Sequence, residues 1–189
     1  MAKFRLGITF VLFTYFHATV LLCQSIEPID TWFQNIKLLP IPKFAIIEFY
    51  DQDVLSVNGE TSYVIATSSI TSTSPTVFGQ LSMVDNLITA GPDPNSAAIG
   101  RRQGLVGLCD LNELAVYLSL NFIFNGGMYN GSTISVLGRR PVLKNQQEIS
   151  IVGGTGDFRL ARGIAVLNTY VLNTTGDYIV KYTLYVTYL

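Results

Sequence analysis

The sequence predicts an all-β domain that closes into a barrel. From Lys43 onward, short runs of β-branched, aromatic and aliphatic residues alternate with segments rich in Gly, Pro, Asn and Asp. No segment has the pattern of a long helix, and about eight or nine strands in one domain favour a barrel, whose interior holds side chains or one small ligand. The composition agrees, because only 13% of the residues are charged whereas 49% are hydrophobic.

Residues 1–25 have the pattern of a secretory signal peptide. Lys3 and Arg5 precede an apolar run over 6–23, and small residues at 23–25 fit a signal peptidase site, so we expect cleavage after Ser25. A membrane anchor is the alternative, because the apolar run reaches the lower length limit of a span. Polar residues dilute the run and no basic cluster follows it, so we expect no membrane segment in the mature protein.

Residues 26–42 show little periodicity and are expected to form an N-terminal arm before the barrel domain, 43–189. The strands are expected over 43–50, 61–67, 78–85, 102–109, 114–124, 132–138, 147–153, 163–172 and 178–188. A five-residue loop, 173–177, joins the last two strands as a hairpin. In the final strand the even-numbered residues from Tyr178 to Tyr188 share one face, so one face is expected to pack and the other to meet water.

Residues 152–163, VGGTGDFRLARG, raise the question of a phosphate-binding loop. A dinucleotide fingerprint needs G-x-G-x-x-G at the start of a helix, but Arg159 occupies the third glycine position. The following residues, 164–172, have the composition of a strand. We therefore predict a tight turn, which uses glycine for its backbone angles.

The mature chain lacks the residues of several common catalytic sites. The only histidine, His17, and Cys23 lie in the signal peptide, which leaves Cys109 as the one cysteine. This excludes Ser-His-Asp and Cys-His catalysis, a His/Cys zinc site and an intrachain disulfide, and we expect no metal and no cofactor. Acidic residues outnumber basic ones and no basic stripe is present, so we expect no nucleic-acid partner. Cys109 is expected to pack in a strand as a small apolar residue.

Two glycosylation sequons fit a secretory route. They are Asn130-Gly131-Ser132 and Asn173-Thr174-Thr175, and both fall in predicted turns. We therefore expect Asn130 and Asn173 to carry glycans.

Several long stretches, in order along the chain, resemble the plant dirigent proteins. These are FGQLSMVDNLITAGPDPNS (78–96), IGRRQGLVG (99–107), NFIFNGGMYNGSTISVLGRRPVL (121–143), ISIVGGTGDFRLARGIA (149–165) and a tyrosine-rich last strand. The resemblance spans about residues 43–189. It implies an eight-stranded antiparallel barrel of the closed, lipocalin-like type, secretion to the plant apoplast or cell wall, and a homodimer or homotrimer.

The resemblance also implies a function. Dirigent proteins do not oxidise their substrate: an auxiliary oxidase, a laccase or peroxidase, makes phenoxy radicals from phenylpropanoids such as coniferyl alcohol. The barrel then directs their coupling to one stereoisomer, which gives optically active lignans. Radical coupling needs oriented binding rather than a nucleophile, and a carboxylic acid can assist closure of the quinone methide. The alternatives are a lyase or cyclase acting on a phenolic or isoflavonoid alcohol, and a non-catalytic phenolic-binding protein of the cell wall or of defence.

The resemblance also indicates site residues. The family's first strand ends in Phe-Tyr-x-His-Asp, which here is FYDQD (49–53), so Asp53 keeps the family aspartate. By strand alternation Phe49, Asp51 and Asp53 share one face. We expect Asp53 to be the general acid and Asp85 to be its hydrogen-bonding partner or a second acid. Phe49, Asp51 and Arg162 are expected to contact the substrate.

The chain departs from the lignan-forming members in three places. These members carry an aspartate where Arg140 stands here and an arginine where Gln147 aligns, and they have tyrosines after the Gln-Gly pair where this chain reads QGLVGLC (103–109). Other members use the same barrel for dehydrative ring closure in isoflavonoids, and these changes bear on which chemistry this chain performs.

Overall fold

The computed structural model describes residues 29–36, 41–55, 59–144, 146–172 and 177–189. The expected signal peptide and Asn173 lie outside these ranges. The described residues 29–36 belong to one unit and those of 41–189 to another. The strands are β1 (Lys43–Asp53), β2 (Ser62–Ala66), β3 (Leu81–Thr89), β4 (Ala98–Leu108), β5 (Ala115–Phe124), β6 (Thr133–Pro141), β7 (Gln147–Thr155), β8 (Arg162–Leu172) and β9 (Tyr178–Tyr188).

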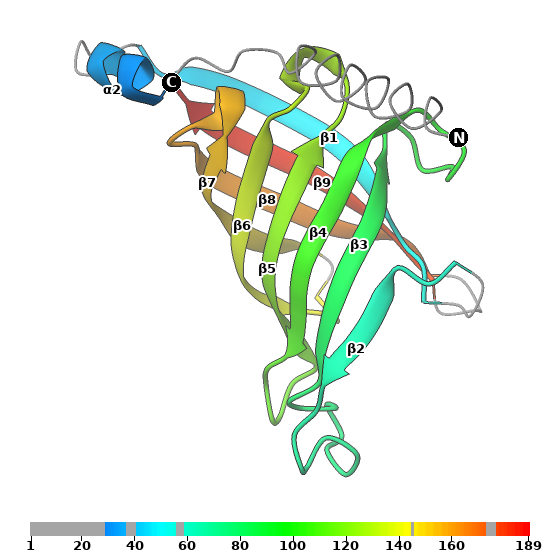
Figure 1. Ribbon diagram of the computed structural model, residues 1–189. Coiled ribbons are helices and arrows are strands. Elements are labelled where there is room, and N and C mark those ends of the chain that lie inside the picture. The colour runs from blue at the N-terminus through cyan, green and yellow to red at the C-terminus, as the bar shows by residue number, and fades with distance from the viewer. Residues whose placement is uncertain (1–28, 37–40, 56–58, 145, 173–176) are drawn as a thin grey trace, which may run out of the picture. The chain divides into compact units, whose positions relative to one another are not determined.

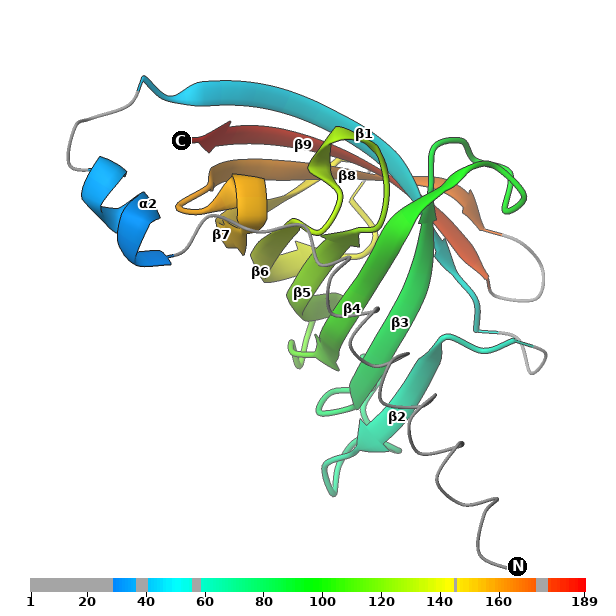
Figure 2. The same ribbon diagram turned by 45° about the horizontal axis from the view of Figure 1, so that its top comes forward.

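The second unit is the closed antiparallel barrel that the sequence predicts. The strand order is β1-β9-β8-β7-β6-β5-β4-β3-β2, and an additional β1–β3 pairing closes the sheet. Eight strands therefore form the barrel. The ninth, β2, pairs only with β3 and lies outside the closed barrel (Figures 1 and 2). The closing contact is short, running from Tyr50↔Thr89 to Gln52↔Leu87, while β1 pairs with β9 along its whole length.

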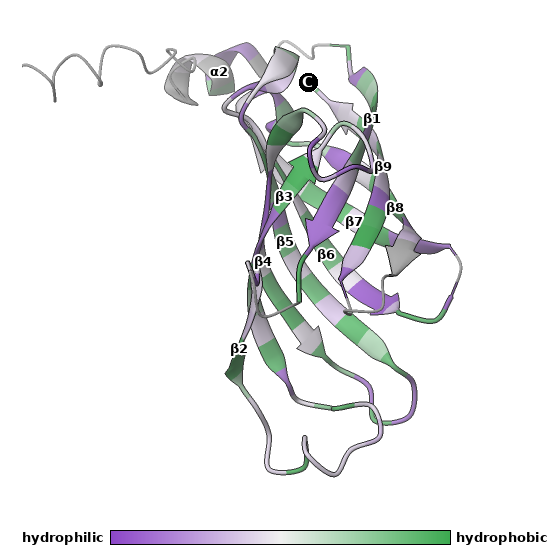
Figure 3. Ribbon diagram, turned by 90° about the vertical axis from the view of Figure 1, so that its right-hand side faces the viewer, coloured by the Kyte–Doolittle hydropathy of each residue, from purple (hydrophilic) through white to green (hydrophobic). Residues whose placement is uncertain are grey.

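Alternation along the strands separates the barrel interior from its surface, and Figure 3 shows hydrophobic and hydrophilic residues alternating along several strands. In β9 the even-numbered residues Val180, Tyr182, Leu184 and Val186 are buried, which confirms the predicted packed face. At the centre of the interior Tyr182 stacks on Phe49 with ring centroids 5.3 Å apart, and Phe122 meets both rings edge-on. These aromatic contacts form the core around which the polar groups described below are placed.

The structure shifts two strands relative to the prediction. The strand expected over 78–85 is β3, which begins later and continues through Asn86 to Thr89. The strand expected over 102–109 begins at Ala98 and ends just before Cys109, whose half-buried thiol lies 3.6 Å from the carbonyl oxygen of Ala115. The end of β3 and the start of β4 differ from the prediction because the two strands pair up to Thr89↔Ala98, beyond the residues whose composition predicted them.

The glycine-rich stretch forms a turn, as predicted. β7 ends in it, a short 3-10 turn over Gly156–Phe158 follows, and β8 begins at Arg162. Gly156 has a φ of +63°, a left-handed conformation that favours glycine. A phosphate loop would require a helix after the glycines, and a strand follows instead.

The arm expected over 26–42 contains a short helix, α2 (Ile29–Ile36), that we did not expect. Apolar residues at 29, 32, 33 and 36 recur at helical spacing, but eight residues are too few for this pattern to stand out in the sequence. Within the described ranges, no helix is both long and apolar enough to cross a membrane.

Candidate functional site

Two carboxylates of β1 lie on the face of the strand that lines the barrel interior. Phe49 and Asp51 are fully buried, and the Asp53 side chain keeps 21% of its exposure. This arrangement follows from the two-residue period of a strand, because alternate residues share a face. The structure thus brings together three of the residues that the sequence indicated, Phe49, Asp51 and Asp53.

Arg102 joins the two carboxylates from β4. Its Nε lies 3.0 Å from Oδ2 of Asp51, and its Nη2 donates a hydrogen bond to Oδ2 of Asp53, also at 3.0 Å. The guanidinium is almost as buried as Asp51, with an exposed fraction of 3%. β3 lies between β1 and β4 at this level, so Arg102 spans one strand to reach both acids.

Asn86 and Tyr182 complete this interior polar cluster, which we define as Asp51, Asp53, Asn86, Arg102 and Tyr182. Asn86 is the cross-strand neighbour of Arg102 and is fully buried, as is Tyr182. Asn86 interacts with the carboxylate of Asp51 and favours its charged form, and the hydroxyl of Tyr182 interacts with the guanidinium of Arg102. The five side chains therefore interact as one polar cluster inside an apolar barrel.

The electrostatics of the cluster are set by burial. The pKa of Asp51 is raised to about 6. Burial is the largest cause and the charge of Asp53 adds to it, while the attraction of Arg102 lowers the pKa. Burial lowers the pKa of Arg102, but the attractions of Asp51, Tyr182 and Asp53 together outweigh it, so the pKa lies above its ordinary value and the guanidinium stays charged. Two acids thus share one permanent cation.

A second polar group lies on the inward face of β6. Arg140 donates from Nε to the side-chain oxygen of Gln147 at the start of β7, and its Nη2 lies 3.4 Å from the hydroxyl of Thr169. These are two of the places at which the sequence departs from the lignan-forming members, and the structure brings them into direct contact. An arginine and an amide therefore stand together where those members carry an acid and an arginine.

The structure does not bring Asp85 to Asp53, contrary to our expectation. Asp85 lies on the outer face of β3, where its side chain is 52% exposed and pairs with Arg101. Because successive residues of a strand point to opposite faces, the next residue, Asn86, takes the inward position. Asp85 therefore cannot serve as the acid partner of Asp53 within the barrel.

Arg162 also lies away from the cluster. It is the exposed first residue of β8, and its guanidinium donates to the backbone carbonyls of Val152 and Ala161. These bonds hold the end of β8 against β7. The expected contact between Arg162 and a substrate bound beside Asp53 is thus not supported by its position.

Sequence reasoning missed Arg102, Asn86 and Tyr182 as site residues. Tyr182 was predicted on the packed face of its strand, but nothing marked it as a neighbour of the acids. The pair Arg101-Arg102 within one strand carried a usable signal, since one of two adjacent arginines must face inward. Which one faces inward depends on the register of β4 against its neighbours.

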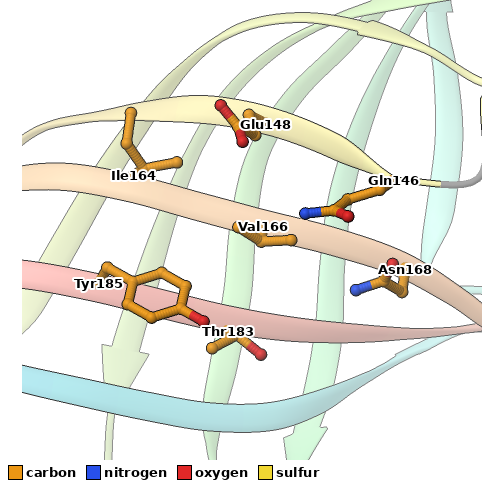
Figure 4. A pocket seen from close by; sticks show the side chains of 7 residues that line it. All are labelled: Gln146, Glu148, Ile164, Val166, Asn168, Thr183 and Tyr185. Carbon is orange, nitrogen blue, oxygen red and sulfur yellow. The ribbon is translucent and has the colours of Figure 1, made fainter.

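A separate groove lies on the outer surface of the barrel, over β7, β8 and β9 (Figure 4). It has a volume of about 500 Å³ and is lined by Gln146, Glu148, Ile164, Val166, Asn168, Thr183 and Tyr185. These side chains point away from the interior, so the groove does not communicate with the polar cluster. The buried charged groups Asp51 and Arg102 lie inside the barrel, and we place the candidate site there.

The two remaining predictions concern glycosylation and metal binding. Asn130 is exposed and directly follows the 3-10 turn Gly127–Tyr129, as an acceptor in a surface turn would be. Asn173 lies outside the described residues. In the parts of the chain that the structure describes, no cluster of three His, Cys, Asp or Glu side chains is placed to hold a metal ion.

Comparison with known proteins adds family information to this geometry. The model of the Dirigent-like protein family matches residues 45–187. Dirigent protein 21 of Arabidopsis thaliana is 39% identical over 145 residues, which cover 76% of this chain and 77% of the relative. Pterocarpan synthase 1 of Glycyrrhiza echinata is 32% identical over 165 residues, covering 86% and 85%. The solved structure of the pterocarpan synthase dirigent protein GePTS1 superposes with a TM-score of 0.71 at 31% identity, covering 79% of this chain and 87% of that one.

Proposed function

The chain belongs to the dirigent family, and from this premise we propose that it closes a ring on a phenolic alcohol bound inside the barrel, with Asp53 as the general acid. The observation that carries the proposal is the difference between the two inward carboxylates that contact Arg102. Asp53 is still partly exposed, whereas Asp51 is fully buried. We therefore assign the contact with a bound molecule to Asp53, the less buried of the two. The similarity to pterocarpan synthases supports ring closure as the reaction class.

The chemistry required of Asp53 is a proton transfer in each direction. Asp53, which is paired with Arg102 in the free protein, must take up a proton to act as the acid; it then donates this proton to the leaving hydroxyl of the substrate, and the carbon–oxygen bond breaks as water departs. A phenolic hydroxyl of the same molecule then attacks the resulting electron-poor carbon, and its proton returns to the carboxylate. The net reaction loses one water and regenerates the acid, so no oxidant is consumed.

Arg102 and Asp51 have supporting roles in this proposal. Arg102 holds Oδ2 of Asp53, which leaves Oδ1 without a protein hydrogen bond in the described residues. Asp51 is too buried to reach a substrate and acts as the counter-ion that keeps Arg102 between the two acids. The barrel wall restricts the approach of the attacking group, which is how a single stereoisomer would result.

Stereocontrolled coupling of oxidase-generated phenoxy radicals is the second candidate. The aromatic core around Phe49, Phe122 and Tyr182 favours it, since such surfaces stack flat phenolic rings. In this case a laccase or peroxidase is the functional partner, and Asp53 protonates the quinone methide formed by coupling. The contact between Arg140 and Gln147 replaces residues that lignan-forming members use, which places coupling second.

We also infer a secreted, apoplastic protein that assembles as a dimer or trimer. The outer face of β1 exposes Phe44 and Ile46, with exposed fractions of 78% and 69%, and neighbouring β8 and β9 add Ile164 and Tyr185. Contiguous apolar surface of this kind on a barrel wall favours association with another copy. Light scattering of the purified protein, compared with an Ile46→Lys variant, tests the assembly.

The experiment that tests the function compares reactions with and without an oxidase. Purified protein is incubated with a panel of phenolic and isoflavonoid alcohols alone, and with coniferyl alcohol plus a laccase, and products are separated by chiral chromatography. We expect turnover without oxidase that falls about 10²–10⁴-fold in Asp53→Asn. Asp85→Asn is the matched control, because it removes an equivalent charge from the outer face.

Each alternative has its own outcome in this experiment. An enantiomeric excess that appears only with the laccase would replace ring closure by coupling. Tight binding of phenols with neither turnover nor product bias would favour a non-catalytic wall or defence protein. Equal losses in Asp53→Asn and Asp85→Asn would remove Asp53 from the proposed role.

A further inference from the structure

We propose that Arg140 binds a carboxylate carried by the substrate, so that this barrel takes phenols with an acidic side chain in preference to the matching neutral alcohols. This inference rests on the proposed function, because it assumes a phenolic ligand inside the barrel. It adds the substrate class, which neither the family nor the position of Asp53 defines.

The first argument is the position of Arg140. On β6 it follows Ile134 and Val136 at the two-residue period, and both of these side chains are buried in the core. Arg140 is half-buried near the end of this inward row. Its charge acts on the pKa of Asp51, as a group facing the same interior would. Arg140 and the acid pair therefore both lie on inward faces of barrel strands.

The second argument is that the guanidinium is held in a built site. Gln147 is 3% exposed, and its side-chain nitrogen donates to the backbone carbonyls of Val142 and Lys144. With the nitrogen end committed to these carbonyls, the oxygen end must face Arg140, and it accepts the bond from Nε. A fixed Nε also fixes the plane of the guanidinium, whose far edge then points away from Gln147.

The third argument is that Arg140 has no anionic partner. Among the ion pairs of the described residues, Arg101 pairs with Asp85, Arg102 with Asp51 and Asp53, and Arg139 with Asp110 and Glu113. Within the described ranges the guanidinium of Arg140 has hydrogen bonds only to the neutral side chains of Gln147 and Thr169, and the latter contact is long at 3.4 Å. A guanidinium remains charged at any physiological pH, so this is a permanent, uncommitted cation.

The chemistry of the site selects a carboxylate. The planar fork of an arginine matches the two oxygens of a carboxylate, and a single positive charge balances a single negative one. A phosphate would carry more charge than one guanidinium neutralises, and no second inward cation is free, because Arg102 is committed to Asp51 and Asp53. A ligand held by its carboxylate at β6 would extend its phenolic end across the interior toward β1.

The test uses two ligands that differ only in this group, ferulate and coniferyl alcohol. Calorimetric titration of the wild-type protein is expected to show tighter binding of ferulate, and Arg140→Gln is expected to weaken ferulate about 10- to 100-fold while leaving the alcohol within about twofold. Arg140→Lys keeps the charge without the fork and is expected to fall between the two. Arg139→Gln is the matched control, since the neighbouring arginine lies on the outer face.

The outcomes separate this inference from the proposed function. Equal binding of the two ligands, unchanged in Arg140→Gln, would overturn the inference and leave phenol binding intact. In that case Arg140 would act only as a distant counter-charge to Asp51 and Asp53. Absence of binding for both ligands would overturn the proposed phenolic substrate and the inference with it. Circular dichroism of each variant confirms that the barrel is folded before titration.

Discussion

Replacement of Arg102 by methionine gives the sharpest test of the interior polar cluster. Methionine occupies a similar volume but removes the charge that Asp51 and Asp53 share. Asp51 has no exposed surface, so water cannot replace the lost partner. Asp53 retains 21% exposure and can be partly hydrated. The cost of the substitution therefore falls on Asp51.

Breaking a buried ion pair by removing one partner costs about 3–5 kcal/mol in the free energy of unfolding. We expect Arg102→Met to lie in this range at pH 7.5, which is a large part of the total stability of about 5–15 kcal/mol for a domain of this kind. The loss in the free energy of unfolding should be smaller at pH 5. The pKa of Asp51 is already raised to about 6 and rises further without Arg102, so at pH 5 Asp51 is protonated and leaves no unpaired buried charge.

Urea unfolding followed by circular dichroism measures these values. This probe is preferable to fluorescence, because the one tryptophan, Trp32, lies in α2 outside the barrel unit. Arg101→Met, on the outer face, is the control and should cost no more than about 1 kcal/mol. The double variant Asp51→Leu/Arg102→Met should recover most of the loss, since a buried pair replaced by apolar residues is often neutral. Equal costs for Arg101→Met and Arg102→Met would refute the buried-pair reasoning.

Three further predictions concern other parts of the chain. Gly163→Ala should destabilise the barrel by at least about 2 kcal/mol in urea unfolding. Gly163 has a φ of +154°, and a Cβ there would lie 1.9 Å from the carbonyl oxygen of Tyr185. Gly126→Ala is the control, because a Cβ at that position has no heavy atom within 4 Å. The pKa of Asp51 rises from 3.8 to about 6 on folding, so its contribution to stability is present at low pH and is lost as the pH rises across that window. Unfolding measured from pH 4 to 7 should show this slope in the wild type, and the slope should be weaker in Asp51→Asn. Mass spectrometry of the secreted protein should find a glycan on Asn130 that is absent in Asn130→Gln, and an unmodified wild-type site would contradict the predicted glycosylation.

Much of the fold could be predicted from local pattern. Strand alternation placed the packed face of β9 and the shared face of Phe49, Asp51 and Asp53, and the glycine cluster at 152–163 was recognised as a turn. The prediction failed where polar residues occur inside a strand. Asp85-Asn86 reads as the end of a strand, yet β3 continues to Thr89 because Asn86 is placed in the interior beside Arg102. Its environment, which comes from another strand, outweighs its low preference for strands.

The sequence by itself determined the all-β class, the family resemblance and the face of β1 that carries the acids, because each depends on residues close together in the chain. Only the tertiary structure decided the partners of those acids. Arg102 reaches Asp51 and Asp53 through the register of β1, β3 and β4, and Arg140 meets Gln147 across the β6–β7 hairpin. Register has a physical period of two residues, so a shift by one would have put Arg101 inside and Arg102 outside. Local sequence does not encode that choice, which is made when the whole barrel closes.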